Sequence, residues 1–304
     1  MAARPKRTVS EFGAGRELVS IGLERGLLRD VYHRLLTMAW RRFFALVFAG
    51  YLGINALFAC GYWALPGAIE NARPGSFADV FFFSVQTLAT IGYGKMAPAT
   101  VGANLLVTAE ALLGMVGLAV TTGLVFARFS RPTARVLFSK VAVVAPYERV
   151  PSLMFRMANA RGNQIVEARL RLTLVRNDVT ADGEPVRRLH DLKLRRSEHA
   201  AFALTWTAIH PIDQESPLHG KDAAELRATM SDFIVSLTGT DEGLSQTIHA
   251  RHAYRSDDIR WNAKFADILT PGADRSVIDY TKFHEVVPLA EATGARAARL
   301  RETA

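Results

Sequence analysis

The stretch Ser84-Val85-Gln86-Thr87-Leu88-Ala89-Thr90-Ile91-Gly92-Tyr93-Gly94 decides the fold, because it lies between two apolar segments that are each long enough to cross a bilayer. Gly92 and Gly94 have no Cβ, so the backbone there can adopt conformations closed to other residues. That freedom lets successive carbonyls turn toward one axis, and the hydroxyl of Thr90 can add an oxygen at the lower end. Several copies of such a loop around one axis would surround a dehydrated cation with oxygens.

The last five residues of this stretch resemble the potassium-channel selectivity filter, whose signature is Thr-X-Gly-Tyr-Gly. The match is direct at Thr90, Ile91, Gly92, Tyr93 and Gly94. The resemblance implies that oxygens of these residues replace the water shell of a potassium ion. Potassium is then the permeant ion, and no cofactor or other metal is expected. A glycine-rich turn that happens to carry a tyrosine is the alternative, and the apolar segments on both sides argue against it.

Two apolar segments, residues 43–65 and 101–127, are predicted to cross the membrane; the first has no charge and Glu110 is the only charge of the second. Basic residues cluster before the first span and after the second, whereas the connecting segment has only Arg73 and Lys95. The positive-inside rule therefore predicts that both termini are cytoplasmic and that the filter loop is on the outer side. We expect a multi-pass plasma membrane protein, in the inner membrane if the source is a bacterium.

Between the spans, residues 76–94 are predicted to form a re-entrant pore helix followed by the filter. Ser76 can cap this helix, and Asp79 lies in its first turn. The helix is apolar but too short to span, so it must be surrounded by protein. Together with the two spans it makes a predicted pore domain of residues 43–130.

The other segments are assigned from composition and pattern. Residues 30–42 are amphipathic and are predicted to be a helix at the membrane interface, or simply the basic flank of the first span. The short alternating runs of residues 141–287 predict an Ig-like β-sandwich on the cytoplasmic side. The remaining predictions are a basic, partly disordered cytoplasmic lead (1–29), a linker (131–140) and a C-terminal helix or tail (288–304).

With two spans, a filter and a C-terminal β-domain, the chain resembles the inward-rectifier potassium channels, in particular their prokaryotic branch. Local sequence agrees at Arg131-Pro132, Ser216-Pro217-Leu218 and Ser231-Asp232-Phe233. The resemblance implies a potassium-selective homotetramer with fourfold symmetry, gated at the inner helix bundle. Two alternatives stay open: a potassium channel of another two-span family, and a non-conducting, membrane-tethered β-sandwich sensor.

Five residues of the pore domain are candidates for filter support or gating. Glu110 is costly in a membrane, so it is expected to line the cavity or support the filter, or else to make a buried hydrogen bond. Gln86, in the pore helix, is a second candidate for filter support. Gly114 and Gly123 match the family's helix-bending positions, although small residues also permit close packing. Phe126 matches the bulky residue that constricts the family's inner-helix bundle, unless it faces lipid.

Basic residues at the inner ends of the spans, together with Trp40, form a cationic belt that is predicted to bind anionic phospholipid or phosphoinositide. Ordinary positive-inside topology explains the same charges without a specific lipid site. The belt comprises Trp40, Arg41, Arg42, Arg128, Arg131, Arg135 and Lys140.

Two positions depart from the pattern of the family. Lys95 follows the filter where many potassium channels carry Asp, so four copies at the outer mouth would repel cations. Leu118 occupies the mid-helix position at which strongly rectifying members carry Asp, so weak rectification is predicted.

Composition excludes several other classes of protein. The net charge of +8 is placed largely beside the spans, which favours a membrane partner over nucleic acid. Cys60 is the only cysteine, so neither an internal disulfide nor a cysteine-based metal cluster can form. The chain has no His-Glu-x-x-His and no Gly-x-Ser-x-Gly motif, and we do not expect an enzyme.

Overall fold

The structure is a computed structural model that describes residues 7–12, 16–21, 31–270 and 277–290. The chain forms two compact units. The membrane unit is residues 24–131, and the β unit is residues 132–304 together with residues 1–23.

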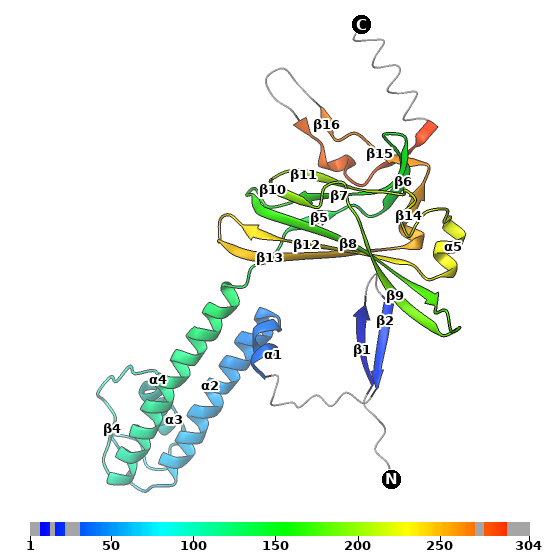
Figure 1. Ribbon diagram of the computed structural model, residues 1–304. Helices are drawn as coiled ribbons and strands as arrows, with labels where there is room; N and C mark the ends of the chain where they lie inside the picture. Colours follow the sequence, from blue (N-terminus) through cyan, green and yellow to red (C-terminus); the bar gives the residue numbers. More distant parts are fainter. Residues whose placement is uncertain (1–6, 13–15, 22–30, 271–276, 291–304) are drawn as a thin grey trace. The chain divides into compact units, whose positions relative to one another are not determined.

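The membrane unit contains two long apolar helices, α2 (Trp40–Trp63) and α4 (Val101–Phe129), which lie side by side (Figure 1). Both are long and apolar enough to cross a membrane. The 24 residues of α2 extend about 36 Å, which exceeds the hydrocarbon thickness of a bilayer. A shorter apolar helix, α3 (Phe77–Leu88), packs against both of them, and α1 (Val31–Thr37) precedes α2.

Capping side chains fix where the helices begin. The Ser76 side chain accepts a hydrogen bond from the amide of Asp79 at 3.3 Å and caps α3. The Thr100 hydroxyl accepts from the amide of Ala103 at 3.2 Å and caps α4. The strands β3 (Ile69–Glu70) and β4 (Ala97–Pro98) pair antiparallel and join the loop after α2 to the segment before α4.

The helix ends differ from the predicted ranges. The interfacial helix predicted over 30–42 is interrupted at Ala39, whose backbone is extended (φ −60°, ψ 145°). Residues 40–42 therefore open α2, and the first long helix covers 40–63 in place of the predicted 43–65. The second continues two residues past the predicted 127 and ends at Phe129, because the residue before Pro132 is biased away from helical conformations.

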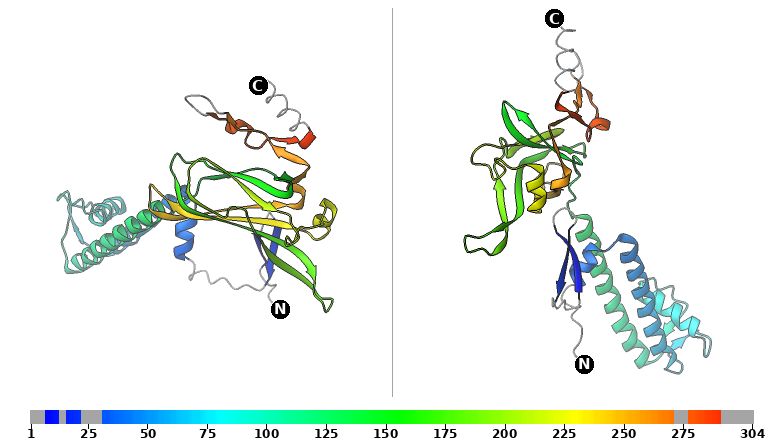
Figure 2. Two further views of the ribbon diagram at one scale, coloured as in Figure 1. Left: turned by 45° about the horizontal axis from the view of Figure 1, so that its top comes forward. Right: turned by 90° about the vertical axis from the view of Figure 1, so that its right-hand side faces the viewer.

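Two sheets lie face to face in the β unit (Figure 2). One has the strand order β10-β8-β12-β13, with β9 paired to the other end of β8. The other has the order β11-β7-β6-β14, with β5 paired to β7. The strands of the two sheets are β5 (Val136–Phe138), β6 (Ala142–Tyr147), β7 (Val150–Asn159), β8 (Ile165–Val179), β9 (Pro185–Leu192), β10 (Glu198–Phe202), β11 (Thr205–Pro211), β12 (Asp232–Asp241), β13 (Gln246–Arg255) and β14 (Ile259–Trp261).

Shorter elements complete the β unit: helix α5 (Ala223–Ala228), the 3₁₀ turns Ser256–Asp258 and Tyr280–Lys282, and two small antiparallel pairs. The pairs are β15 (Ala263–Phe265) with β18 (Val286–Pro288), and β16 (Leu269–Thr270) with β17 (Val277–Ile278).

The core between the sheets follows from alternation along the strands. In β8, Ala168, Leu170, Leu172 and Leu174 are all buried, as the alternating pattern predicts. They pack with aromatic side chains of both sheets, among them Phe155, Phe202, Trp206 and Phe233. The intervening β8 residues face outward, and among them are arginines.

Two predicted segments outside the sandwich need correction, and a third is described only at its start. The lead, residues 1–29, contains a hairpin of β1 (Arg7–Phe12) and β2 (Arg16–Ile21), whose runs are separated by Gly13-Ala14-Gly15. The linker, residues 131–140, contains β5, because the apolar run Val136-Leu137-Phe138 pairs with β7 and Phe138 joins the core. The C-terminal segment predicted as a helix or tail from Pro288 is helical at residues 289 and 290, directly after β18, and the remainder of it lies outside the described residues.

Candidate ion-conduction site

The filter segment continues directly from the end of α3. The amides of Ala89, Thr90 and Ile91 donate to carbonyls of the last turn of α3, the last of them to Gln86 at 2.8 Å. These bonds use up carbonyls that a helix end leaves free, and so fix the direction in which the chain leaves the helix. Gln86 contributes to the filter through its main chain in this way.

Every second residue of the filter backbone has a positive φ. Thr90, Gly92 and Gly94 have φ of 56°, 57° and 78°, whereas Ile91 and Tyr93 are not in the positive region. Such alternation turns consecutive carbonyls to one side of the chain, which is the arrangement that can replace the hydration of an ion. Glycine adopts it at little cost, whereas Thr90 is held there against its steric preference.

The filter residues are uncovered in the single chain. Ile91 is 46% exposed and Tyr93 is 74% exposed. Lys95, just beyond the filter, is exposed as well, and its carbonyl accepts a hydrogen bond from the side chain of Asn71 at 3.0 Å. Exposed large apolar side chains that lie close together are typical of an interaction surface.

Behind the filter lies a fully buried polar network that joins α2, α3 and α4. Glu110 of α4 accepts hydrogen bonds from the Tyr62 hydroxyl of α2, at 2.6 Å, and from the Ser84 hydroxyl of α3. Asn55 of α2 lies 3.0 Å from the same serine hydroxyl, and its amide donates to the carbonyl of Tyr51 at 2.7 Å. Glu110, Ser84 and Asn55 are 0% exposed, so the carboxylate is satisfied by protein alone.

This network excludes one interpretation of Glu110, that it lines a cavity. A side chain that is fully buried in one chain stays buried in any assembly, so Glu110 does not line an open cavity. It holds the pore helix against both long helices, which agrees with filter support and with a buried hydrogen bond. Sequence reasoning missed Tyr62 and Ser84 as its partners. Asn55 and Tyr62 are seven residues apart and therefore lie on one face of α2. This spacing of polar residues in an apolar span is the sequence pattern that could have indicated a polar partner.

The glycines and Phe126 of α4 occupy different environments. A Cβ on Gly114 would lie 2.6 Å from the carbonyl oxygen of Leu88, so α3 packs directly on α4 at this glycine. A Cβ on Gly123 would meet no atom within 4 Å. Phe126 is 72% exposed in the single chain. Close packing therefore explains Gly114, whereas nothing in the described residues requires glycine at position 123.

At the C-terminal end of α4, arginines bind the end of α1. Arg128 donates to the carbonyls of Leu35 and Met38, the second at 2.6 Å, and Arg131 donates to the carbonyl of Leu36 at 3.0 Å. A helix leaves its last carbonyls unpaired, and a cation there is also favoured by the helix dipole. The guanidinium of Arg128 lies 4.4 Å from the ring centre of Trp40 and is largely buried.

The predicted cationic belt is thus divided. Trp40 and Arg128 are in contact within the membrane unit, and Arg41 and Arg42 are exposed on α2. Arg135 and Lys140 are exposed in the β unit. Arg128 and Arg131 already donate to carbonyls at the end of α1, so among the described arginines of the belt it is Arg41, Arg42 and Arg135 whose exposed side chains could meet an anion.

Comparison with known proteins gives the family. Residues 136–303 match the family described as the inward rectifier potassium channel C-terminal domain, and residues 52–131 match the family described as ion channel. The chain is 50% identical over 286 residues to inward rectifier potassium channel Kirbac3.1 of Paramagnetospirillum magnetotacticum, covering 93% of this chain and 97% of that protein. This chain belongs to the inward-rectifier potassium channel family.

More distant relatives in the family come from animals. Inward rectifier potassium channel 18 of Homo sapiens is 29% identical over 280 residues, which cover 85% of this chain and 65% of that protein. ATP-sensitive inward rectifier potassium channel 12 of Mus musculus is 29% identical over 283 residues, which cover 85% of this chain and 66% of that protein. The chain spans just under two thirds of the length of these two relatives.

Family membership confirms the predicted fold class. The chain is a membrane protein with two transmembrane helices, a re-entrant pore helix with filter, and a C-terminal cytoplasmic β-sandwich. Its relatives are ion channels, which are not enzymes. Among the described residues, no group of three or more His, Cys, Asp or Glu side chains is placed to hold a metal ion.

Proposed function

We propose that four copies of this chain form a potassium-selective channel. Potassium ions pass between the four filters, coordinated by oxygens of Thr90, Ile91, Gly92 and Tyr93. The observation that carries this proposal is the positive φ at every second residue of the filter, 56°, 57° and 78° at Thr90, Gly92 and Gly94. The exposed Ile91 and Tyr93 support it as well, because in a tetramer they would be covered or face the pore.

Rubidium or potassium flux into liposomes tests conduction. We expect uptake by the reconstituted wild-type chain, with sodium excluded, and loss of uptake in Gly92→Asp. Gly162→Asp is the matched control, since Gly162 lies in an exposed turn of the β unit and a Cβ there meets nothing within 4 Å. A monomeric purified protein, or equal passage of sodium and potassium, would refute the proposal.

The orientation in the membrane is part of the same proposal. Both termini face the cytoplasm and the filter faces outward, in the inner membrane if the source is bacterial. Support comes from the basic residues that precede α2 and follow α4. Labelling of single cysteines in whole cells by a membrane-impermeant reagent tests it: position 71 is expected to react from outside and position 149 only after lysis.

Gating is proposed at the inner helix bundle, where four copies of Phe126 would form an apolar constriction that closes by losing its water. The exposure of Phe126 in the single chain supports this role. Phe126→Ala is expected to raise potassium flux, and unchanged flux would contradict it. Phe129→Ala is the control on the same helix, and Phe129 is equally exposed.

Anionic lipid, including phosphoinositide, is proposed to modulate the gate through the exposed basic residues Arg41, Arg42, Arg135 and Lys140. Each such charge contributes about 1 kcal/mol of attraction to an anionic surface. Flux measured with and without phosphoinositide in the liposomes tests this, and Arg41→Gln with Arg42→Gln is expected to reduce the response at least several-fold. An undiminished lipid response would remove these residues from the proposal.

A further inference from the structure

The segment between α2 and the pore helix is paired with the chain that leaves the filter. Its strand β3 runs antiparallel to β4, and the amide of Ala99 donates to the carbonyl of Ala68 at 2.8 Å. Strand β4 begins two residues after Lys95, and Asn71 follows β3 directly. The pairing therefore brings Asn71 beside the exit of the filter.

The side chain of Asn71 binds the first carbonyl beyond the filter. Its Nδ2 atom donates to the carbonyl oxygen of Lys95 at 3.0 Å, and Lys95 directly follows Gly94. Asn71 has a φ of 61°, a left-handed conformation that asparagine adopts more readily than most residues. Because the side chain is short, this backbone conformation fixes the direction of its donor.

Two residues further on, the same segment is fixed to the start of the pore helix. The main-chain amide and Nε of Arg73 donate to one carboxylate oxygen of Asp79 at 2.9 Å, and Nη2 donates to the other at 2.8 Å. Such a forked arginine–carboxylate pair is specific in its geometry. Asp79 lies in the first turn of α3. Residues 71–73 therefore connect the beginning of the pore helix with the exit of the filter.

The outer half of the filter has little other support in the single chain. At the inner end, the amides of residues 89–91 donate to carbonyls of α3. Among the described residues, the hydrogen bond from Asn71 is the only one that reaches the main chain of residues 92–95. Glycine lets the backbone turn there but does not hold it in one conformation. The position of the outer carbonyls therefore depends on Asn71.

We propose that Asn71 is a positioning residue for ion selectivity: by holding the carbonyl of Lys95, it keeps the outer filter carbonyls at a spacing that suits potassium better than sodium. The inference rests on the proposed function and adds to it a residue outside the filter. Asn71 acts through the main chain of Lys95 and does not contact the ion. When the outer end is free to move, the carbonyls can approach a smaller ion, and the preference for potassium falls.

Reversal potentials in planar bilayers, with potassium on one side and sodium on the other, test the proposal. The permeability of sodium relative to potassium is expected to rise about threefold in Asn71→Gly and in Asn71→Asp, as the loss of one hydrogen bond allows. Both replacements tolerate a positive φ, so folding is expected to persist. The permeability ratio does not depend on how many channels are folded, so a merely structural defect would lower the current and leave the ratio unchanged.

The two variants separate the lost donor from side effects of each replacement. Asn71→Asp adds a charge that attracts both cations, and Asn71→Gly adds backbone freedom, whereas only the loss of the donor is common to both. A ratio equal to that of the wild type in either variant would overturn the proposal, because the effect would then come from charge or from flexibility.

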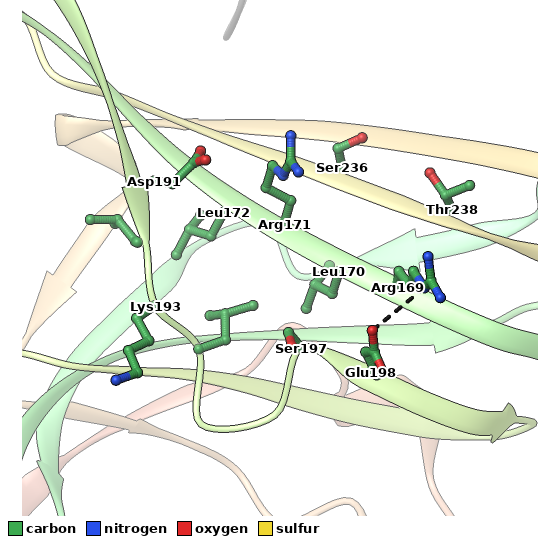
Figure 3. Close-up of a pocket in the computed structure, with 12 residues that line it drawn as sticks. Arg169, Leu170, Arg171, Leu172, Asp191, Lys193, Ser197, Glu198, Ser236 and Thr238 are labelled. Atoms are coloured by element: carbon green, nitrogen blue, oxygen red, sulfur yellow. Dashed lines mark ion pairs between the residues drawn. The ribbon is translucent and has the colours of Figure 1, made fainter.

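Asn104→Ala is the matched control, because it removes an exposed amide that donates to a carbonyl at the start of α4, that of Thr100 at 2.9 Å. Glu198→Gln is a second control, which removes the exposed ion pair with Arg169 in the β unit, where no part of the filter lies (Figure 3). Both controls are expected to keep the permeability ratio of the wild type.

An equal rise of the ratio in Asn104→Ala would overturn the role of Asn71, since any substitution on the outer surface would then have the same effect. Failure of the proposed function gives a different result. A wild type without potassium-selective current would refute conduction and the role of Asn71 together, whereas a selective wild type with unaltered Asn71 variants would refute the role of Asn71 alone.

Discussion

The hydroxyl of Tyr62 in α2 lies 2.6 Å from a carboxylate oxygen of Glu110 in α4, and neither side chain is more than 1% exposed. The same carboxylate also binds Ser84 of the pore helix. One acidic side chain thus connects α2, α3 and α4, and the filter follows directly after α3. Buried charges are retained where each oxygen has a partner, and removal of one partner leaves the other uncompensated.

Tyr62→Phe is expected to destabilise the membrane unit without altering its packing shape, because it removes only the buried hydroxyl. The loss is expected to be about 1–2 kcal/mol. Thermal unfolding in detergent, with loss of the oligomer as the readout, measures it. Tyr51→Phe is the control on the same helix, and it is expected to have little effect. Equal stability of Tyr62→Phe and wild type would mean that the network does not hold the filter.

Gly114→Ala separates helix bending from close packing. The added methyl group would lie 2.6 Å from the carbonyl oxygen of Leu88, so the end of α3 would have to move. Overpacking of this kind costs about 1–3 kcal/mol, and potassium flux is expected to fall because the filter follows directly after Leu88. Gly123→Ala meets open space and is expected to keep both stability and flux. If flux fell only in Gly123→Ala, helix bending at Gly123 and not close packing at Gly114 would be required for conduction.

Arg128→Gln is expected to loosen α1. Its guanidinium binds two carbonyls at the C-terminal end of that helix, and a helix of seven residues is not stable by itself. Hydrogen exchange of the amides of residues 31–37 is expected to speed up at least tenfold. Arg41→Gln, which removes an exposed charge on α2, is the control and is expected to leave the exchange unchanged. Unaltered exchange in Arg128→Gln would show that α1 is held by other contacts.

The local elements of the membrane unit could be predicted from sequence because they depend on nearby residues. The apolar runs of α2 and α4 and the capping residue Ser76 are each visible within a few positions. The partners of Glu110 and Arg128 could not be predicted in this way. Tyr62 is 48 residues from Glu110, and Leu35 is 93 residues from Arg128, so only the packed structure shows which atoms meet.

In the β unit, too, some elements could be predicted from nearby residues and others could not. Strand β8 alternates from Ala168 to Leu174, which makes it evident from sequence, whereas β9 begins with a proline and half of its residues are polar, so it has little pattern to find. The break at Ala39 was missed because alanine favours helix, and only the extended backbone there ends α1 and starts α2.

The β unit is expected to lose stability as the pH falls below about 6.5. Burial lowers the pKa of His210, and the nearby Asp213 opposes this only in part. The Nδ1 atom lies 2.7 Å from the carbonyl of Lys193 and must donate, so Nε2, 2.8 Å from the Ser216 hydroxyl, accepts in the neutral form. Because the folded pKa lies below the unfolded value, the stabilisation is complete above the unfolded pKa and is lost as the pH falls through the folded pKa.

His210→Gln is expected to flatten this pH dependence between about pH 7.5 and 5, since one unit of pKa difference corresponds to about 1.4 kcal/mol. Urea unfolding followed by tryptophan fluorescence measures it across that range. The exposed His219 provides the control, because His219→Gln is expected to keep the pH dependence of the wild type. If the free energy of unfolding changed with pH equally in the wild type and both variants, His210 would be excluded as the cause of the pH dependence.

Rectification is expected to be weak, because block by polyamines or magnesium requires negative charge along the inner helix. Leu118 is 71% exposed on α4 in the single chain, and Leu118→Asp would place four carboxylates around the pore of a tetramer. Attraction between several carboxylates and a polyvalent cation in a narrow pore is strong. Spermine is therefore expected to block outward current at least tenfold more tightly in Leu118→Asp, whereas Leu118→Asn, which is polar but uncharged, is expected to behave like the wild type. Planar bilayer recordings with spermine on the cytoplasmic side measure the block. Steep block of the wild type by micromolar spermine would contradict weak rectification, and an unchanged block in Leu118→Asp would mean that position 118 does not face the ion pathway.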